Sequence, residues 1–378
     1  MDALTTPLPK DWEIKTFRDI STINQGLQIP ISQRLKAPTE HAKFYITIQA
    51  LNNRKEFEYI KTYNESVVCH KDDILMTRTG NTGMVITNIE GVFHNNFFKI
   101  NFDRTLINKD FLVYFLSLEQ TQKTILKKAG TSTIPDLNHN DFYSLLIPLP
   151  PLNEQIAIAN ILSDVDRYLY SLDALILKKE SVKKALSFEL LSQRKRLKGF
   201  NQAWQRVRLG DICEITTGSL DANEMVHYGK YRFYTCAKEY YFIDKYAFDT
   251  EAILISGNGA YVGYVHYYKG KFNAYQRTYV LDNFSEHIIF VKYFLTMFLQ
   301  SHIQTNKNEG NTPYIVMATL KYFEILLPPL NEQIAIANIL SALDSEIISL
   351  KNKKRQFDNI KKALNHDLMS AKIRVLKK

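Results

Sequence analysis

The chain has few cysteines, and their positions exclude two kinds of structural support. Only three occur in 378 residues, at positions 69, 213 and 236. They are an odd number, lie far apart and form no Cys-x-x-Cys pair, so neither a disulfide framework nor a zinc site is indicated. The sequence also lacks an apolar run near the ~20 residues that span a membrane. Its first residues lack the basic and apolar pattern of a secretory signal. We therefore expect a cytoplasmic protein with no membrane segment.

Motifs of common catalytic sites are missing as well. There is no Gly-x-x-x-x-Gly-Lys-[Ser/Thr] phosphate loop, and the glycines at 257, 259 and 263 miss the Gly-x-Gly-x-x-Gly spacing. The nine histidines form no metal-spaced cluster. Pro135-Asp136 resembles the start of a nuclease motif, but no acidic-x-Lys partner follows, and no Asn-Pro-Pro-aromatic run of the amino-methyltransferase kind occurs. The chain is expected to be non-catalytic, with no cofactor and no metal.

The excess positive charge lies in two segments. Hydrophobic residues make up 45% and charged residues 23% of the chain, as in a folded globular protein. The formal net charge is +9, but residues 178–198 carry +6 and residues 351–378 carry +8, which leaves the remainder acidic at −5. We expect these segments either to be solvated faces near helix C-termini or to contact nucleic acid. Any DNA contact elsewhere must come from local patches.

The decisive feature is an internal duplication. Residues 150–163 and 328–341 both read PPLNEQIAIANILS, identical at all fourteen positions and 178 residues apart. This period is far too long for a solenoid repeat, so it indicates a duplicated domain with its connector. Weaker matches continue at the same offset, Asp166 with Asp344 and KKAL at 183–186 with KKAL at 361–364.

The segments that precede each copy also correspond, with more drift. Trp12 opens WEIKTFRDI and Trp204 opens WQRVRLGDI, and three further pairs follow: 73–85 with 252–265, 94–103 with 273–282, and 128–137 with 308–317. A duplication kept for stability alone would let all segments drift alike, whereas here the connectors match and the domains differ. The sequence predicts four parts: a domain at 1–149, a connector at 150–198, a domain at 199–327 and a connector at 328–378.

Both connectors are expected to be long helices. Pro150-Pro151 marks the entry of the first, because proline does not fit inside a helix. Asn153 suits the N-cap, and the charge of Glu154 favours the N-terminal end of the helix dipole. No Gly or Pro interrupts residues 152–198 or 330–378. Each helix can therefore run ~40 residues, or ~60 Å at 1.5 Å per residue.

Apolar residues recur in the connectors at alternating steps of four and three, the period of a coiled-coil seam. A lone helix would expose this stripe, so we expect the helices to pair antiparallel as a pseudo-twofold object with one domain at each end. The alternative is that each helix packs back on its own domain. The seam residues are Ile158, Leu162, Val165, Leu169 and Leu172 in the first helix and Ile336, Leu340, Leu343, Ile347 and Leu350 in the second.

A proline pair followed by LNEQ, a long helix and an ILS…D run, present twice and alternating with divergent domains, resembles the specificity subunit of type I restriction-modification systems. The resemblance covers essentially the whole chain, and FNAYQRTYVLD at 272–282 is similar to target-recognition domains of that family. It implies an α+β fold of two mixed α/β target-recognition domains, each reading one half of a split, asymmetric site in double-stranded DNA. The helices would fix the unspecific spacer and dock two adenine-specific DNA methyltransferase subunits together with restriction/translocase subunits.

Three pairs of polar loops are the candidate DNA contacts. Reading a base edge needs hydrogen-bonding side chains on loops or element ends, and glycine allows the backbone to approach phosphate closely. The alternative for each is an ordinary polar turn, and for the tyrosine-rich stretches it is a half-buried strand. The candidates are Arg78, Thr79, Asn81, Thr82, Asn95, Asn96, Thr131 and Ser132 in the first domain, and Asn258, Gln276, Arg277, Asn308, Asn311 and Thr312 in the second.

Two other functions remain open from the sequence. One is a coiled-coil scaffold that brings two protein ligands together without binding DNA. The other is a single-chain nuclease, which the missing acidic cluster disfavours. Salt dependence separates the DNA hypothesis from the scaffold, because phosphate contacts weaken steeply as salt rises.

Overall fold

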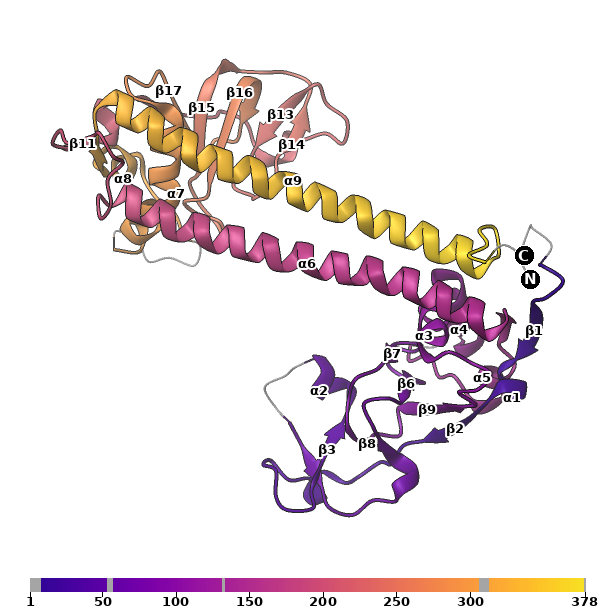
Figure 1. The fold of residues 1–378 in the computed structure, drawn as a ribbon. Helices are drawn as coiled ribbons and strands as arrows, with labels where there is room; N and C mark the ends of the chain where they lie inside the picture. Colours follow the sequence, from indigo (N-terminus) through magenta and orange to yellow (C-terminus); the bar gives the residue numbers. More distant parts are fainter. Residues whose placement is uncertain (1–7, 53–56, 131–132, 306–312, 377–378) are drawn as a thin grey trace. The chain divides into compact units, whose positions relative to one another are not determined.

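The chain folds into two compact units that share its two long helices. The computed structural model describes residues 8–52, 57–130, 133–305 and 313–376. Unit 1 comprises Met1–Asp173 and Lys353–Lys378, and unit 2 comprises Ala174–Asn352. The long helices are α6 (Leu152–Leu191) and α9 (Leu330–Met369). Each unit therefore contains a mixed α/β region, part of α6 and part of α9 (Figure 1).

The described strands of unit 1 form three small sheets, with orders β2-β9-β6-β7, β4-β3-β8-β5 and β1-β10. The strands are β1 (Glu13–Thr16), β2 (Ser21–Gln25), β3 (Lys43–Ile46), β4 (Tyr59–Ile60), β5 (Val68–Cys69), β6 (Ile74–Thr77), β7 (Val85–Ile86), β8 (Gly91–Phe93), β9 (Phe97–Phe102) and β10 (Leu146–Leu149). The shorter helices are α1 (Phe17–Ile20), α2 (Ile48–Asn52), α3 (Lys109–Leu116), α4 (Glu119–Ala129) and α5 (His139–Tyr143).

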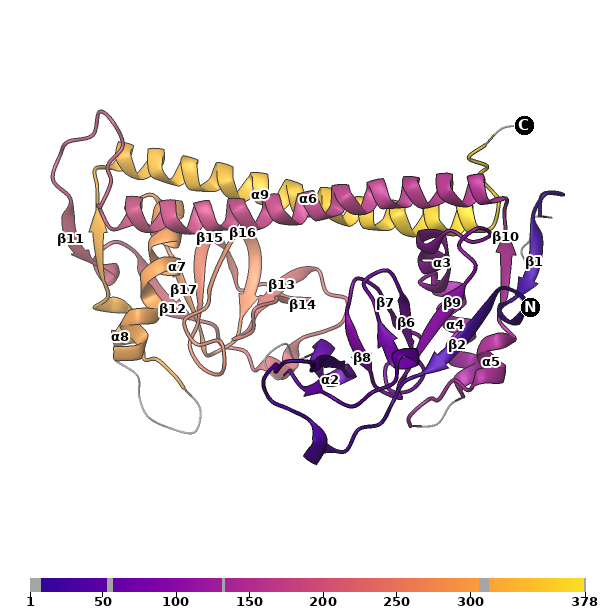
Figure 2. The same ribbon diagram turned by 60° about the horizontal axis from the view of Figure 1, so that its bottom comes forward.

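Helix α3 connects the sheet of unit 1 to the long helices. Asn108 caps it, because its side chain accepts the backbone N–H of Phe111. Phe111 and Leu112 are fully buried in a core that also holds Ile158 of α6 and Leu368 of α9. Figure 2 shows α3 lying between strands such as β9 and the ends of the two long helices. Burial of this apolar face holds the ends of both long helices against the sheet of unit 1.

Unit 2 is built around a larger sheet. Its described strands have the orders β12-β17-β15-β16-β13-β14 and β11-β18. The strands are β11 (Gln205–Arg208), β12 (Glu214–Thr217), β13 (Tyr231–Tyr234), β14 (Tyr241–Ile243), β15 (Phe248–Ser256), β16 (Val265–Ala274), β17 (Thr278–Asp282) and β18 (Glu324–Leu327), and the shorter helices are α7 (Ile288–Thr305) and α8 (Met317–Lys321). The continuous apolar run Ala252–Ile255 is fully buried. Ile253 and Ile255 of this run share a core with Phe290 of α7 and Leu340 of α9.

The two units follow the same plan. In each, a strand bonds in parallel to a neighbour, β3 to β8 and β13 to β16. In each, the first strand of the mixed α/β region pairs antiparallel with the strand before a long helix, β1 with β10 and β11 with β18. The weak sequence correspondence between the domains is therefore matched by the order in which their strands pair.

Both long helices end earlier than their uninterrupted sequences allow, and they end alike. Helix α6 stops at Leu191 and α9 at Met369, 178 residues apart. Two residues after each end, Gln193 and Ala371 have φ values of 63° and 55°. A left-handed residue just past the last turn is a common way to close a helix. The duplicated sequence therefore specifies the helix ends as well as the helix starts.

Among the described residues, helix α9 is long and apolar enough to cross a membrane by length and composition. Its composition alone does not mark a membrane segment, because the core helix of a globular protein can be equally apolar. In the most apolar part of α9, 28% of the residues are buried. Ile336 and Leu340 of α9 belong to the core of unit 2. Packing against the sheet accounts for part of its apolar face.

Candidate nucleic-acid interface

Loops that are far apart in the sequence of unit 1 lie together. The backbone N–H of Arg78 donates to the carbonyl of Asn96 at 2.7 Å, and the N–H of Leu137 donates to the carbonyl of Arg78 at 2.8 Å. Thr79 and Asp136 form an isolated β-bridge. The loop after β6, the turn before β9 and the segment after α4 therefore form one cluster. Below, these three segments are called the loop cluster of unit 1.

Unit 2 builds the same cluster with the same bonds. The N–H of Gly257 donates to the carbonyl of Arg277 at 2.8 Å, and the N–H of Ile315 donates to the carbonyl of Gly257 at 2.9 Å. Asn258 and Tyr314 form the matching bridge. The segments 73–85 and 252–265, and the segments 94–103 and 273–282, thus contribute equivalent backbone bonds in the two units. In the third expected pair, 128–137 with 308–317, residues 131–132 and 308–312 lie outside the described residues.

One glycine in each cluster has a defined structural requirement. Gly83 and Gly263 have φ values of +91° and +80°, and a Cβ atom on either would lie 2.7 Å or 2.6 Å from the side-chain oxygen of Gln122 or Gln300. Each donates its N–H at 2.8 Å to the strand-end carbonyl of Thr77 or Ser256. These contacts close both loops in the same conformation, which side-chain-bearing residues rarely adopt.

Several candidate residues of unit 1 are committed to holding the cluster together. The guanidinium of Arg78 donates to Asp136 at 2.7 Å, lies over the ring of Phe98, and its side chain is only 17% exposed. Thr82 is buried, and its hydroxyl donates to the carbonyl of Pro135 at 2.7 Å. Arg78 would have to leave Asp136 to bind a base bidentately. Both side chains therefore stabilise the loop cluster, whether or not DNA is bound.

The other candidates differ in exposure. Asn81, Gln276 and Arg277 are exposed, whereas Thr79, Asn95, Asn96 and Asn258 are half-buried. The side-chain amide of Asn95 donates to Gln28 at 3.1 Å. Tyr240, Tyr241, Tyr261 and Tyr264 are 38–43% exposed, while Tyr234 is buried. Five candidates lie outside the described residues: Thr131, Ser132, Asn308, Asn311 and Thr312.

A cleft of about 870 Å³ adjoins the loop cluster of unit 1, and sequence reasoning did not find it. Its lining includes Gln49 and Asn52 of α2, together with His94 and Asn96. Burial, helped by the nearby charge of Arg34, lowers the pKa of His94. The neutral ring can then accept the Asn96 N–H at Nδ1, 3.1 Å away. Within KFYIT at 43–47 and YRFYT at 231–235, the threonine shared by the two segments was the available signal for this region.

The LNEQ motif makes equivalent contacts in both units. Glu154 is buried and accepts hydrogen bonds from the indole of Trp12 at 3.0 Å and from Arg374 at 2.7 Å. Glu332 is fully buried and accepts from the indole of Trp204 at 3.2 Å and from Arg196 at 2.6 Å. Each arginine follows the C-terminal end of the other long helix.

The glutamine of the same motif caps a helix of its unit. The side-chain oxygen of Gln155 accepts the N–H of Asn108 at 2.9 Å, just before α3. The side-chain oxygen of Gln333 accepts the N–H of His287 at 3.0 Å, just before α7. These contacts give a physical reason for the recurrence of Glu and Gln in both copies, since each is buried and has hydrogen-bond partners.

The paired aspartates Asp166 and Asp344 also have matching partners. Tyr114 donates to Asp166 at 2.8 Å, and Lys361 lies 2.5 Å from the same carboxylate. Tyr293 donates to Asp344 at 2.6 Å, and Lys183 forms an ion pair with it. Burial opposes ionisation of Asp344, but the bonds from Lys183 and Tyr293 hold its pKa below the usual value.

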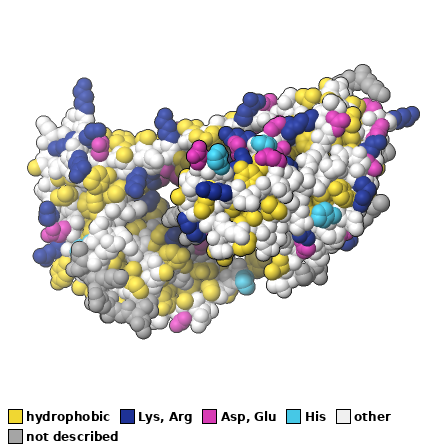
Figure 3. Space-filling view, turned by 90° about the horizontal axis from the view of Figure 1, so that it is seen from below, with side chains coloured by type: hydrophobic (Ala, Val, Ile, Leu, Met, Phe, Trp, Pro, Cys, Tyr) yellow, Lys and Arg dark blue, Asp and Glu magenta, His cyan; other side chains and the backbone are white. Residues whose placement is uncertain are grey.

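Part of the basic charge of residues 178–198 and 351–378 is used in ion pairs between α6 and α9. The sequence left solvated faces and DNA contact as the alternatives, and ion pairing between the helices was not anticipated. On the face seen in Figure 3, Lys and Arg side chains are interspersed with Asp and Glu. Further pairs within a unit are Lys354–Asp173 in unit 1 and Lys179–Glu346 and Lys351–Glu180 in unit 2.

The expected seam residues are divided between two environments. Ile158, Leu162, Ile336 and Leu340 are buried in the cores of their units. Leu169, Leu172 and Ile347 are also buried, whereas Val165, Leu343 and Leu350 are half-buried. In unit 1, the ring of Tyr168 on α6 lies 4.6 Å from that of Phe357 on α9. Packing on the unit and contact between helices thus occur along the same stripe.

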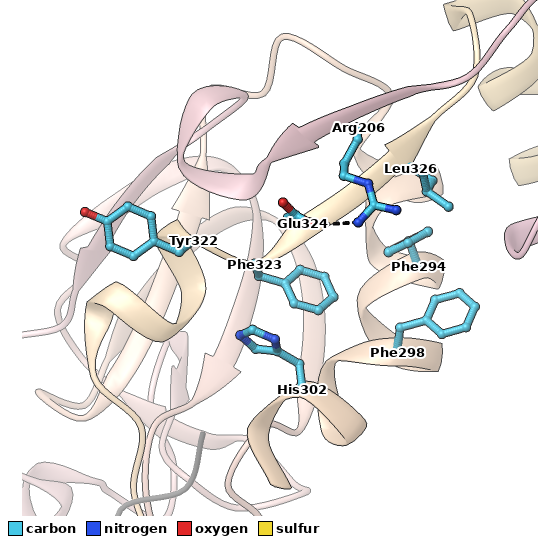
Figure 4. Close-up of a pocket in the computed structure, with 8 residues that line it drawn as sticks. All are labelled: Arg206, Phe294, Phe298, His302, Tyr322, Phe323, Glu324 and Leu326. Carbon is cyan, nitrogen blue, oxygen red and sulfur yellow. Dashed lines mark hydrogen bonds and ion pairs between the residues drawn. The ribbon is translucent and has the colours of Figure 1, made fainter. Parts of the chain in front are cut away.

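A separate cavity of about 380 Å³ in unit 2 lies between the β11–β18 pair, α7 and α8 (Figure 4). Aromatic rings line it, and Arg206 and Glu324 form an ion pair of 2.7 Å at its edge. No residue of the loop cluster lines it. In the described part of the chain, no group of three or more His, Cys, Asp and Glu side chains could hold a metal ion.

Comparison with known families gives a match over most of the chain. The model of the type I restriction modification DNA specificity domain matches twice, at residues 9–179 and 201–357. The specificity subunit of the type I restriction enzyme EcoDI from Escherichia coli is 37% identical over 170 residues, which cover 44% of this chain and 37% of that protein. The MjaVIII specificity subunit from Methanocaldococcus jannaschii is 24% identical over 415 aligned residues, covering 97% of this chain and 94% of that protein.

Solved structures have the same fold. The type I restriction-modification S subunit from M. genitalium matches with a TM-score of 0.64 and 19% identity, covering 96% of this chain and 98% of that one. The HsdS subunit from Thermoanaerobacter tengcongensis matches with a TM-score of 0.51 and 18% identity, covering 97% and 99%. These likenesses confirm the expected mixed α+β fold.

Proposed function

Since this chain belongs to the type I restriction-modification DNA specificity family, whose specificity subunits recognise DNA without catalysing a reaction, we propose that each unit reads one half of a split, asymmetric DNA site. The observation that carries this proposal is the loop cluster, which occurs in both units with the same backbone bonds. The exposed side chains around the clusters differ, Asn81 in one and Gln276 and Arg277 in the other. Two units with the same loop-cluster backbone but different exposed side chains are suited to bind two half-sites of different base sequence.

We further propose that α6 and α9 pair antiparallel along their length, with a pseudo-twofold relation between the units, and set the spacer between half-sites. Support comes from contacts repeated at an offset of 178 residues: Glu154 with Arg374 and Glu332 with Arg196. Within unit 1, Asp166 and Asp173 of α6 pair with Lys361 and Lys354 of α9, in opposite order along the chain. Forty helical residues extend ~60 Å, enough to hold two readers at fixed separation.

Footprinting tests the split-site proposal. The chain, assembled with methyltransferase subunits, should protect two short blocks of base-specific contacts with unread base pairs between them. Protection that depends on base identity throughout one contiguous block would contradict the proposal. Binding that does not weaken as salt rises would favour the protein-scaffold alternative, because phosphate contacts release counterions.

The partners we propose are two adenine-specific DNA methyltransferase subunits and restriction/translocase subunits, assembled in the cytoplasm. Burial explains why Glu154, Gln155 and Ile158 recur in both connectors, but it does not explain the outward residues. Ile156 and its copy Ile334 are 41% and 39% exposed, and the adjacent copies Asn160 and Asn338 are exposed as well. Two equal outward faces suit two copies of one partner.

Placing a charge on these faces should remove the methyltransferase subunits one at a time. Ile156→Glu or Ile334→Glu should leave one subunit bound, and the double variant should leave none, because burying an unpaired carboxylate at an interface is costly. Mass measurement of the purified complexes reads the stoichiometry. Leu177→Glu is the control, since Leu177 is 63% exposed on α6 and its counterpart is Arg355. Two subunits retained by the double variant would rule out these docking faces.

A further inference from the structure

The chain follows the same path in both units as far as one buried threonine. Thr47 and Thr235 directly follow strands β3 and β13, and they are 6% and 7% exposed. Just before them, the carbonyls of Ile46 and Tyr234 accept the N–H of His94 and Tyr275, each at 2.9 Å. These bonds tie each strand end to the loop cluster. The segments that directly follow the two threonines have different conformations.

In unit 1 the next residues form a short helix against the cluster. The Thr47 hydroxyl accepts the N–H of Ala50 at 3.1 Å and so begins α2. A Cβ atom on Gly80 would lie 2.8 Å from the Ile48 side chain, which shows how closely α2 approaches the loop after β6. Gln49 and Asn52 are exposed, line the adjoining cleft and stand three residues apart, on one face of the helix.

In unit 2 the equivalent residues 236–240 form an irregular segment, also against the cluster. The Cys236 thiol donates to the carbonyl of Arg277 at 3.3 Å. The ring nitrogen of His266 lies 2.9 Å from the carbonyl of Ala237. Lys238 is exposed, with its ammonium 5.2 Å from the ring centre of Tyr261. Each unit therefore presents different polar groups at the same place on a shared scaffold.

We infer that residues 48–52 and 236–240 determine which bases the two units read. This inference rests on the proposed reading of half-sites and assigns it to particular side chains. Amide side chains such as Gln49 and Asn52 match the N6 and N7 edge of adenine, whereas a lysine such as Lys238 matches O6 and N7 of guanine. Unit 1 then requires an adenine, and unit 2 a guanine, at the position that these groups contact.

Sequencing the DNA methylated by the chain with its methyltransferase subunits tests the assignment. In Gln49→Ala/Asn52→Ala, the preference for adenine at one position of one half-site should fall roughly tenfold to a hundredfold, with the other half-site unchanged. Lys238→Ala should relax a guanine in the other half-site only. Lys321→Ala replaces an exposed lysine of unit 2 outside the segment and should leave the motif intact. The unchanged half-site in each variant shows that the protein is folded.

The outcomes separate the two levels of the argument. A split wild-type motif that neither variant alters would overturn the assignment to residues 48–52 and 236–240 and leave the proposed function standing. A variant that relaxes both half-sites equally would also overturn it. A contiguous wild-type motif would refute the proposed function, and the assignment with it.

Discussion

Replacing Arg196 by Met should destabilise unit 2 by about 3 kcal/mol, because it leaves the Glu332 carboxylate buried without its cation. Glu332 is fully buried, and the Arg196 side chain is 23% exposed. The guanidinium donates to both carboxylate oxygens, at 3.2 and 2.6 Å. With Arg196 gone, the indole of Trp204, 3.2 Å from Glu332, is a donor that cannot neutralise the charge.

Urea unfolding monitored by tryptophan fluorescence measures this loss. The chain has two tryptophans, so a Trp12→Phe background reports unit 2 through Trp204 alone. Lys351→Met is the matched control, because it removes a cation from another pair between α6 and α9 in the same unit. Lys351 and Glu180 are 56% and 41% exposed, so its loss should cost under about 1 kcal/mol. Equal costs for Arg196→Met and Lys351→Met would show that burial of Glu332 is not what makes the contact strong.

The start and class of the long helices could be predicted, but their environment could not. The prolines and the apolar period predict a helix that begins near residue 152 or 330. The expected N-cap at Asn153 was wrong, because α6 already begins at Leu152, and Asn153 lies in its first turn. A 3.5-residue stripe looks the same whether a sheet or another helix covers it. The period therefore assigned Ile158 and Ile336 to the seam between the helices, although both lie in the cores of their units. Which surface buries an apolar side chain depends on the tertiary arrangement, which the period does not encode.

The loop clusters were partly predictable because the duplication aligns them. Matching 73–85 with 252–265 and 94–103 with 273–282 identified loops that prove to occupy equivalent positions. The partners of individual side chains could not be found in this way. The ion pair of Asp136 with Arg78, for example, joins residues 58 positions apart. The position of α2 beside the loop cluster was also not predicted, because the duplication gives no guide there: residues 48–52 have no counterpart helix among the described residues of unit 2.

Lengthening both long helices by three heptads should lengthen the spacer of the DNA site by about one helical turn. Three heptads, about 21 residues, preserve the seam and add ~32 Å at 1.5 Å per residue. One turn of DNA is ~34–36 Å, so both half-sites would again face the protein. The insertions belong after Asp173 in α6 and after Asn352 in α9, where the two units divide. Contacts within each unit then remain.

A single-heptad insertion in both helices is the control for the rotational position of the half-sites around the DNA axis. It adds ~10 Å, about three base pairs and roughly a third of a DNA turn. The half-sites would then lie on different sides of the duplex, and binding should be much weaker than with three heptads. Equal binding by both variants would argue against a rigid helical spacer.

The spacer length in the DNA methylated by the three-heptad variant tests the central claim most directly. We predict that the half-sites keep their wild-type base sequences and are separated by about nine or ten additional base pairs. That number of base pairs matches the length that the inserted residues add to the helices. An unchanged spacer in a folded, active complex would contradict it, because the distance between the readers would then not be set by α6 and α9.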